Sequence, residues 1–542
     1  MLKHIVFISL MLLSWQFSFA KNYYVHPILG NDNQSGLTIK KAFKTLSKLE
    51  NIQLVAGDKV YLAAGEIFEQ SLNLNNQMGT ALNPIIISSL NWKTLKTDSA
   101  ATINFIGKPN GILIQDCSYI TIQNIKLTGN GFVKEDVISP MRCGVLINNK
   151  NTRLMESITL DNLYIHDVYY QKQGFVKDPG EVKTANGTQK YGWGIRVINN
   201  NKEGLITKIN ILNCTIKDVG HTGIKLTGNN KNISNTNIIN NKVIAVGGPG
   251  IQMSGVKDIH VTQNLVNYSG SETESRKWGR GSGLWTWGSS NVLIEKNRFL
   301  NANGPGDSAG AHIDYNCDNI VIQYNLSAFN AGGFCEILGN NFNCAYRYNI
   351  SYNDGFREKG KNGAFQEGKT LWLSGYTGNK SPKNGPTNNY IYNNTIYCDS
   401  LIIPKVAFEK TSNHVIIANN IFAIQRDFKV VTGDQLKADS TLAIQIPNSI
   451  FKNNLFLNKS CWPNQIKFSE EVNFYANPQL KITNPLNLTS YIPQNIGAIK
   501  NMGVLITEFE KQNDIKLLYS LKLDYDILGK PITGKPSIGA IQ

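Results

Sequence analysis

The chain has 542 residues, a formal net charge of +15 at pH 7 and 8 cysteines, none of them in a CxxC pair. This length and sparse cysteine usage exclude a small disulfide-stapled domain and leave several ordinary domains or one elongated repeat architecture. The positive charge favours an anionic partner, but no basic run is dense enough to indicate nucleic-acid binding.

The first twenty residues have the features of a secretory signal peptide. Lys3 provides a positive charge, residues 5–15 are largely apolar, and Ser18-Phe19-Ala20 resembles a cleavage site. We therefore predict cleavage after Ala20 and a secreted or periplasmic protein. No later stretch reaches the ~18 continuous apolar residues of a membrane span. For an exported protein of this charge, an acidic or sulfated glycan is the better candidate anion, and most cysteines are expected to be buried as small hydrophobic residues.

A short motif, in which Asn precedes an apolar strand, recurs through the middle of the chain. It occurs at Asn124, Asn162, Asn213, Asn241, Asn264, Asn297, Asn325, Asn349, Asn394, Asn420 and Asn454. The shortest central spacing is 23 residues, from 241 to 264, and other repeats carry inserted loops. Period-2 strands at this spacing predict a solenoid of stacked coils, whereas a propeller needs repeats of ~40 or more residues. Asn tolerates left-handed corners and can hydrogen-bond to the equivalent Asn of the next coil.

With this pattern the chain resembles the right-handed parallel β-helix proteins of the pectin-lyase-like superfamily. YYVHPILGNDNQSGLTIKKAFKTLSKL is similar to the strand-and-helix opening segment of many exported members, and DYDILGKPITGKPSIGAIQ is similar to a frequent closing segment. The resemblance implies an all-β fold, a single right-handed parallel β-helix with an N-terminal cap and a short C-terminal β-rich tail. The expected boundaries are 1–20 for the signal peptide, 21–84 for the cap and first coils, 85–460 for the β-helix and 461–542 for the closing coils. Members include lyases, hydrolases and binding proteins, so the fold alone does not decide the activity.

One strand in each repeat follows a glycine, and we aligned six of them on Gly194, Gly223, Gly250, Gly283, Gly310 and Gly332. Strand alternation points the first and third following residues inward, among them Leu226, Met253 and Ile313, and the second and fourth outward. The second residues after the glycines form one outward column, which contains Arg196, Lys225, Gln252, Trp285, His312 and Phe334. The fourth residues after the glycines form the other outward column, which contains Ile198, Thr227, Ser254, Trp287, Asp314 and Glu336. The pattern LWLS adds Trp372 and Ser374 further along.

Asp314 and Glu336 share a column in this alignment, 22 residues apart (314 to 336). Stacked strands lie ~4.8 Å apart, so the two carboxyl groups should repel and one should hold a proton near neutrality through a raised pKa. A protonated acid beside an ionised carboxylate is the arrangement that glycosidic cleavage needs. His312, on the same face, could orient either group or donate to the substrate. We therefore predict Asp314, Glu336 and His312 as catalytic residues.

Further residues on this face or in adjoining loops are predicted to bind substrate. They are Trp285, Trp287, Lys225, Arg196, Asp307, Glu367 and Trp372. The tryptophans offer surfaces for sugar rings, the two cations could hold a carboxylate or sulfate, and the two loop carboxylates could reach over the site. The alternative is that these are ordinary solvated positions, because a solenoid displays many outward polar residues.

The leading interpretation is an exported, monomeric glycoside hydrolase that acts on a polysaccharide or its oligosaccharides. The second is a polysaccharide lyase, in which Arg196, Lys225 and His312 supply a base and neutralise a uronate, with or without Ca²⁺. The third is a non-catalytic glycan-binding surface protein. No metal-ligand motif is predicted and no cofactor is certain; Asp and Asn oxygens are plentiful enough for Ca²⁺, although no fixed-spacing loop supports it.

Overall fold

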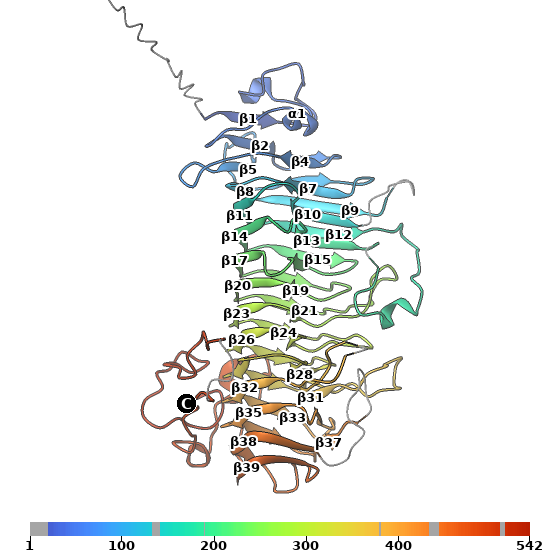
Figure 1. Cartoon of the computed structure of the whole chain (residues 1–542). Helices are drawn as coiled ribbons and strands as arrows, with labels where there is room; N and C mark the ends of the chain where they lie inside the picture. The colour runs from blue at the N-terminus through green and yellow to red at the C-terminus, as the bar shows by residue number, and fades with distance from the viewer. Residues whose placement is uncertain (1–19, 133–140, 189, 379–380, 433–443, 510–514) are drawn as a thin grey trace, which may run out of the picture.

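The computed structural model describes residues 20–132, 141–188, 190–378, 381–432, 444–509 and 515–542. The predicted signal peptide therefore lies outside the described residues, except for Ala20. Within the described ranges, no helix combines the length and the apolar character that crossing a membrane requires. Figure 1 shows strands stacked in one long column, with a cap at the N-terminal end and the C-terminal segment along the side of the last coils.

The column consists of three runs of parallel strands, and each full coil contributes one strand to each run. The first run contains β1 (Asn22–Val25), β2 (Lys59–Ala63), β5 (Ile85–Leu90), β8 (Ile120–Gln123), β11 (Leu154–Asp161), β14 (Leu205–Leu212), β17 (Ile233–Ile239), β20 (Val256–Thr262), β23 (Ser290–Glu295), β26 (Asp318–Gln323), β29 (Ala345–Arg347), β32 (Thr387–Tyr392), β35 (Asn413–Ala418), β38 (Ile444–Phe456) and β39 (Ile466–Tyr475). The second run contains β3 (Ile67–Phe68), β6 (Ala101–Asn104), β9 (Ile125–Asn130), β12 (Tyr164–Tyr169), β15 (Thr215–Val219), β18 (Lys242–Ile244), β21 (Leu265–Asn267), β24 (Arg298–Leu300), β27 (Leu326–Ala328), β30 (Ile350–Tyr352), β33 (Thr395–Cys398) and β36 (Ile421–Ile424). The long strand β38 pairs with both β35 and β36, so these two runs form one sheet.

The third run is a separate sheet made of the strands that begin at or near the aligned glycines, and it is called the site sheet below. It contains β4 (Leu72–Asn75), β7 (Asn110–Gln115), β10 (Arg142–Asn149), β13 (Gly192–Asn199), β16 (Ile224–Thr227), β19 (Ile251–Ser254), β22 (Leu284–Trp287), β25 (Ala311–Ile313), β28 (Gly333–Ile337), β31 (Lys369–Leu373), β34 (Lys405–Phe408) and β37 (Lys429–Val430). All these strands pair in parallel, which confirms the predicted stack of the strands after Gly223, Gly250, Gly283, Gly310 and Gly332 in one sheet.

The interior of the coils is a continuous apolar core. Leu226, Met253 and Ile313 are fully buried in it, which confirms their predicted inward phase. All eight cysteines are free and buried, as expected for small hydrophobic residues. Because successive side chains of a strand alternate between faces, burial of these three residues places their neighbours Lys225 and His312 on the outer face of the site sheet.

A buried ladder of asparagines runs beside this core. The Nδ2 group of each donates to Oδ1 of the next, beginning with Asn241 to Asn264 at 2.9 Å and ending with Asn454 to Asn473 at 3.0 Å. The motif residues Asn124, Asn162 and Asn213 differ, because they lie at left-handed corners (φ 51° to 54°) just outside the ladder. These corner residues also bond between coils, since Asn162 Nδ2 donates to Asn124 Oδ1 at 2.6 Å and Asn240 Nδ2 donates to Asn213 Oδ1 at 2.7 Å. Both roles predicted for Asn are therefore combined at the corner position, and the buried ladder adds a second line of bonds beside it.

The two ends of the chain cover the solenoid in different ways. β1, the 3₁₀ helix η1 (Ile39–Lys41) and the short helix α1 (Ser47–Glu50) form the cap, as the opening segment predicted. At the other end the strands continue past residue 460 to Tyr475. The remaining described residues are not β-rich: they contain η3 (Leu488–Tyr491), η4 (Ile496–Ala498) and isolated bridges. They run back along the coils because the outer side chains of the last strands there are apolar and are buried by this segment.

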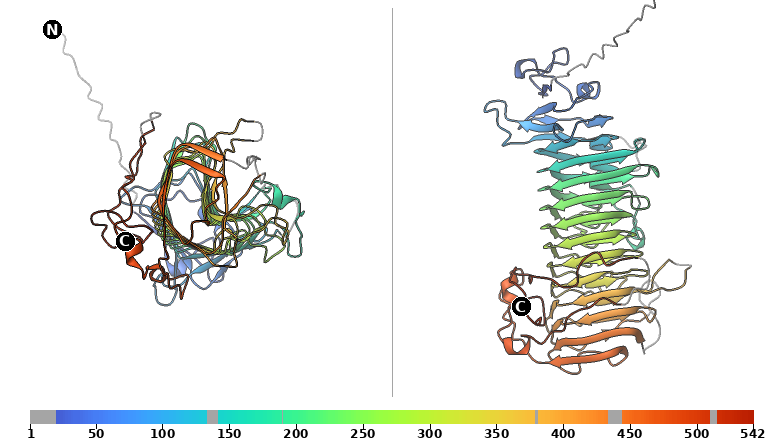
Figure 2. Two further views of the ribbon diagram at one scale, coloured as in Figure 1. Left: turned by 90° about the horizontal axis from the view of Figure 1, so that it is seen from below. Right: turned by 60° about the vertical axis from the view of Figure 1, so that its left-hand side comes forward.

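Long insertions occur where the second run leads into the site sheet. Viewed along the axis, they project on one side of the column, whereas the C-terminal segment lies on the opposite side (Figure 2). The insertions include residues 170–191, which carry the 3₁₀ helix η2 (Glu181–Lys183), and residues 268–283, 301–310 and 353–368. They overhang the outer face of the site sheet and turn it into a cavity.

Candidate active site

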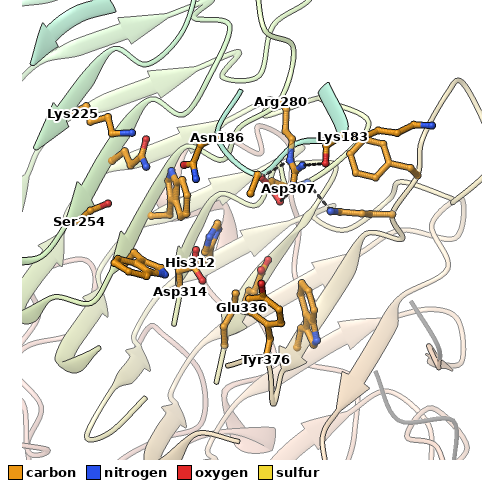
Figure 3. Close-up of a pocket in the computed structure, with 18 of the residues that line it drawn as sticks. Lys183, Asn186, Lys225, Ser254, Arg280, Asp307, His312, Asp314, Glu336 and Tyr376 are labelled. Carbon is orange, nitrogen blue, oxygen red and sulfur yellow. Dashed lines mark hydrogen bonds and ion pairs between the residues drawn. The ribbon is translucent and has the colours of Figure 1, made fainter. Parts of the chain in front are cut away.

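A cavity of about 780 Å³ lies on the outer face of the site sheet under these insertions (Figure 3). Its floor comes from strands β16 to β31 and its walls from the loops around residues 183–186, 280, 307 and 365. Eight of the predicted site residues line it. They are Lys225, Trp285, Trp287, Asp307, His312, Asp314, Glu336 and Trp372. The column alignment therefore identified the face of the sheet that carries the cavity, and the overhanging loops enclose it.

The predicted pairing of Asp314 with Glu336 in one column is wrong. Ile313 pairs with Ile337, an offset of 24 residues rather than 22, so Glu336 lies beside His312. The difference arises at the start of β28, where Gly332 precedes the strand and Gly333, with φ +146°, begins it. Gly333 pairs with Ala309, so Phe334 rather than Gly332 lies opposite Gly310. A shift of two residues preserves the outward phase, because the side-chain period of a strand is two. Asp314 and Glu336 are thus diagonal neighbours that line the same cavity.

Asp314 holds its proton to an unusually high pH. Burial raises its pKa from 3.8 to about 6, and the nearby carboxyl groups of Glu336 and Asp307 add to the rise. The charge of His312 and a 2.7 Å hydrogen bond from the Tyr315 backbone N–H to Oδ1 act in the opposite direction. A carboxyl group of this kind changes protonation state close to neutral pH, which suits proton transfer.

Glu336 is perturbed further. Burial raises its pKa from 4.5 to about 8, and the positive charge of Lys369 offsets this only in part. At pH 7 Glu336 therefore keeps its proton, whereas Asp314 is mostly ionised and becomes protonated only below about pH 6. The pair thus contains one neutral and one ionised carboxyl group at neutral pH, as expected, but the main cause is desolvation rather than mutual repulsion.

The ionised carboxylate of the cavity is Asp307. Its two oxygens accept hydrogen bonds from Arg280, at 2.8 Å from Nε and 3.0 Å from the second guanidinium nitrogen. Burial alone would raise the pKa of Asp307, but the guanidinium charge and its hydrogen bonds lower it below the usual value. Arg280 also donates to the carbonyls of Lys183 and Thr184 at 2.9 and 2.8 Å, so one side chain ties two walls together.

His312 lies between these carboxyl groups and the tryptophans. Its Nδ1 is 3.0 Å from the buried hydroxyl of Ser282, and that hydroxyl accepts a hydrogen bond from the Ala309 backbone N–H. Burial lowers the pKa of His312, although Asp314 and Asp307 oppose the change. A neutral imidazole whose Nδ1 accepts from Ser282 carries its proton on Nε2, where it can serve as a hydrogen-bond donor.

The cavity wall at residues 183–186 is held by an aromatic stack. His221 lies between Trp193 and Trp278, with ring centroids 3.9 and 4.5 Å away, and its Nε2 is 3.1 Å from the Asn186 carbonyl. Trp278 Nε1 also donates to the Glu181 carbonyl at 3.2 Å. These contacts fix the insertion over the site sheet without placing His221 in the cavity.

Two of the predicted substrate-binding residues do not line the cavity. Arg196 belongs to the right column, but its guanidinium stacks over Trp193 at 4.2 Å and lies beside the Met141 sulfur. Glu367 points toward Lys405 and Lys429, at 3.9 and 4.0 Å. Arg196 lies on β13, one coil before β16, which is the first strand of the cavity floor. The loop that carries Glu367 directs this side chain toward the two lysines rather than into the cavity.

Several cavity residues were absent from the predicted site. They are Lys183, Asn186, Phe365 and Gln366 from the insertions, Tyr376 from the loop after β31, and Thr227, Gln252, Ser254 and Leu338 from the floor. The floor residues were available from the same column alignment that identified Lys225 and Trp285. The wall residues carry no periodic signal, because an inserted loop has no repeat. In the part of the chain that the structure describes, no group of three or more His, Cys, Asp or Glu side chains is arranged to hold a metal ion.

Comparison with known proteins agrees with this architecture. The family model for the right handed beta helix region matches residues 193–363, which include most of the cavity floor. The fold is a right-handed parallel β-helix. Lacto-N-biosidase from Bifidobacterium longum subsp. longum is 24% identical over 629 aligned residues, which cover 96% of this chain. The β-helix chain spans only about a third (36%) of the length of that relative.

Solved structures show the same fold. The GH136 lacto-N-biosidase from Eubacterium ramulus has a TM-score of 0.51 at 21% identity, covering 76% of this chain and 67% of its own. XylC in complex with xylose has a TM-score of 0.50 at 10% identity, covering 96% of this chain and 98% of its own. At these identities the likeness establishes the β-helix fold, and the activity has to be argued from the site.

Proposed function

We propose that the protein is a glycoside hydrolase that cleaves a polysaccharide or its oligosaccharides. The observation that carries the proposal is the difference in pKa among three carboxyl groups in one cavity. Asp307 is kept ionised by Arg280, whereas burial raises the pKa of Asp314 to about 6 and that of Glu336 to about 8, so both carry a proton in mildly acidic solution. A pair of carboxyl groups whose environments push their pKa values apart is the requirement for acid-assisted glycosidic cleavage.

In the proposed reaction, Asp314 donates its proton to the glycosidic oxygen as the bond to the anomeric carbon breaks. Asp307 provides the negative charge on the other side of the bond, either attacking the anomeric carbon or accepting a proton from the attacking water. The leaving sugar thus gains a proton, and water supplies the hydroxyl group of the second product. Glu336 and His312, each with a proton to donate, are placed to hold substrate hydroxyl groups.

The aromatic residues of the cavity support a carbohydrate substrate. Trp287 is 46% exposed, and an indole on this scale of exposure offers a flat apolar surface to a sugar ring. Trp285 and Trp372 also line the cavity, on either side of His312 and Glu336 in the same column. Such platforms on both sides of the carboxyl groups suit a substrate that extends beyond the cleaved bond.

Two finer features complete the proposal. The similarity to lacto-N-biosidases makes glycans that contain lacto-N-biose the first substrates to try. We also propose that the protein acts as a monomer, since one chain supplies the floor and the walls of the cavity. A lyase would need a free cation beside its base to neutralise a uronate; Arg280 is bound to Asp307, and Lys225 lies three strand steps away from His312.

The test is a screen of the purified protein against neutral and uronate-containing glycans, including glycans that contain lacto-N-biose. We expect new reducing ends without the ultraviolet absorbance of unsaturated sugars, which only a lyase would produce. Asp314→Asn and Asp307→Asn should each lower turnover by ~10²-fold or more. The matched control is Asp318→Asn, since Asp318 pairs with Lys231 at 3.0 Å outside the cavity. Binding of glycans with no product from any of them would contradict the proposal and favour a binding protein.

A further inference from the structure

The cavity has a second polar end, away from the carboxyl groups. Lys225 lies in the same column as His312, and the pairings Lys225 to Gln252, Gln252 to Trp285 and Trp285 to His312 separate them by three strand steps. At the usual spacing between strands this is a distance of roughly 14 Å. In Figure 3 Lys225 lies apart from Asp314 and Glu336, and its side chain extends toward the other cavity residues.

Lys225 is a buried cation without a carboxylate. The residue is 7% exposed, and among the described residues its ammonium makes no hydrogen bond or ion pair. Its ammonium lies over the Trp193 ring, whose centroid is 5.1 Å from Nζ. Burial and, to a smaller extent, the positive charge of Arg196 together lower the pKa of Lys225 from 10.5 to about 7. A buried charge without a partner destabilises the protein, and an anionic ligand would provide that partner.

The neighbours of Lys225 are also incompletely bonded. Thr227 Oγ1, Gln252 Oε1 and Trp285 Nε1 are buried and have no hydrogen-bond partner in the described structure. All three residues line the same end of the cavity. Buried polar groups are nearly always paired, so a cluster of unpaired ones around a cavity indicates a ligand that is itself polar.

We infer that this end of the cavity, formed by Lys225, Thr227, Gln252 and Trp285 and called the Lys225 subsite, binds a carboxylate or sulfate group carried by the substrate. The group would sit on a sugar about a disaccharide away from the cleaved bond. The inference rests on the proposed glycosidase function for its position in the substrate, but the binding itself does not depend on catalysis.

The charge distribution would also set the direction of the substrate. Arg196 stacks over Trp193 behind Lys225, so its fixed positive charge adds to the field at this end. The carboxyl groups of Asp307, Asp314 and Glu336 lie at the other end. An anionic substituent would therefore be attracted to the Lys225 subsite and repelled from the catalytic centre, which leaves one orientation of the glycan in the cavity.

The experiment measures binding of matched sugars to the full chain by calorimetry at about pH 6. The pairs are galacturonate against galactose, glucuronate against glucose, and galactose 6-sulfate against galactose, which separates carboxylates from sulfates. At least one anion should bind about tenfold more tightly than its neutral counterpart, the scale of one hydrogen bond to a charged group. Lys225→Met should abolish that difference. Lys217→Met, an exposed lysine of the same coil on β15, should preserve it.

The wild-type comparison alone can overturn the inference. If no anionic sugar binds more tightly than its neutral partner, or if none binds at all, the Lys225 subsite does not recognise anions. The same conclusion follows if Lys225→Met retains the full preference. Hydrolysis of neutral glycans without a preference for anions would contradict the inferred subsite and leave the hydrolase proposal intact. A preference for anions with no hydrolysis of any glycan would support the subsite and contradict the hydrolase proposal.

Discussion

Replacement of Asp314 by Asn should remove activity and stabilise the protein at the same time. The pKa of Asp314 is raised from 3.8 to about 6, mainly by burial. Each pKa unit corresponds to 1.36 kcal/mol, so ionising Asp314 destabilises the folded state by at most about 3 kcal/mol. Asn keeps the shape of the side chain and can still accept the hydrogen bond from the Tyr315 backbone, but it cannot ionise.

The sign of this effect depends on pH. Because the pKa is higher in the folded state, the unfolded chain releases the proton first, and stability falls as pH rises from about 3.8 through about 6. The Asn variant escapes this loss. Denaturant unfolding should therefore show wild type and variant close together at about pH 4. At about pH 8 the variant should be more stable by up to about 3 kcal/mol.

Turnover supplies the second readout. As general acid, Asp314 should produce the alkaline limb of the pH–rate profile near its pKa of about 6, and the Asn variant should lose that limb with ~10²-fold or more of the rate. Asp318→Asn, which breaks an ion pair with Lys231, should show neither the gain in stability nor the loss of activity. A variant with equal stability differences at both pH values would refute the buried-carboxyl argument. Undiminished turnover would place the proton donor elsewhere.

Three further changes test other parts of the structure. Arg280→Met removes the bidentate partner of Asp307, so the acidic limb of the pH–rate profile should move upward; an unmoved limb would show that another group sets it. Trp287→Ala should raise KM with little change in the unfolding midpoint, because the indole is 46% exposed, and unchanged KM would argue against sugar stacking. Asn297→Ala removes one rung of the buried ladder and should lower the free energy of unfolding by about 1–3 kcal/mol, measured by denaturant titration; a neutral effect would mean that the ladder is not stabilising.

The sequence alone determined the repeating part of this molecule. Alternation of apolar and polar residues places Leu226 and Ile313 in the core and Lys225 and His312 outside, since a strand has only two faces and one of them must be buried. The recurring Asn marked each coil, because its amide can both donate to and accept from the equivalent Asn of neighbouring coils, as in the buried ladder. These signals are local and periodic, so they can be found without coordinates.

Tertiary structure decided what the repeat does not encode. The offset between β25 and β28 depends on how the turn at Gly332 and Gly333 extends, and this moved Glu336 from the column of Asp314 to that of His312. The ionised carboxylate could be recognised only once Arg280, from one insertion, was found against Asp307 from another. Insertions have no period, and their positions follow from the contacts they make. The protonation states of the cavity follow in turn from the burial that those insertions impose, because desolvation depends on the surrounding protein and not on neighbours in sequence.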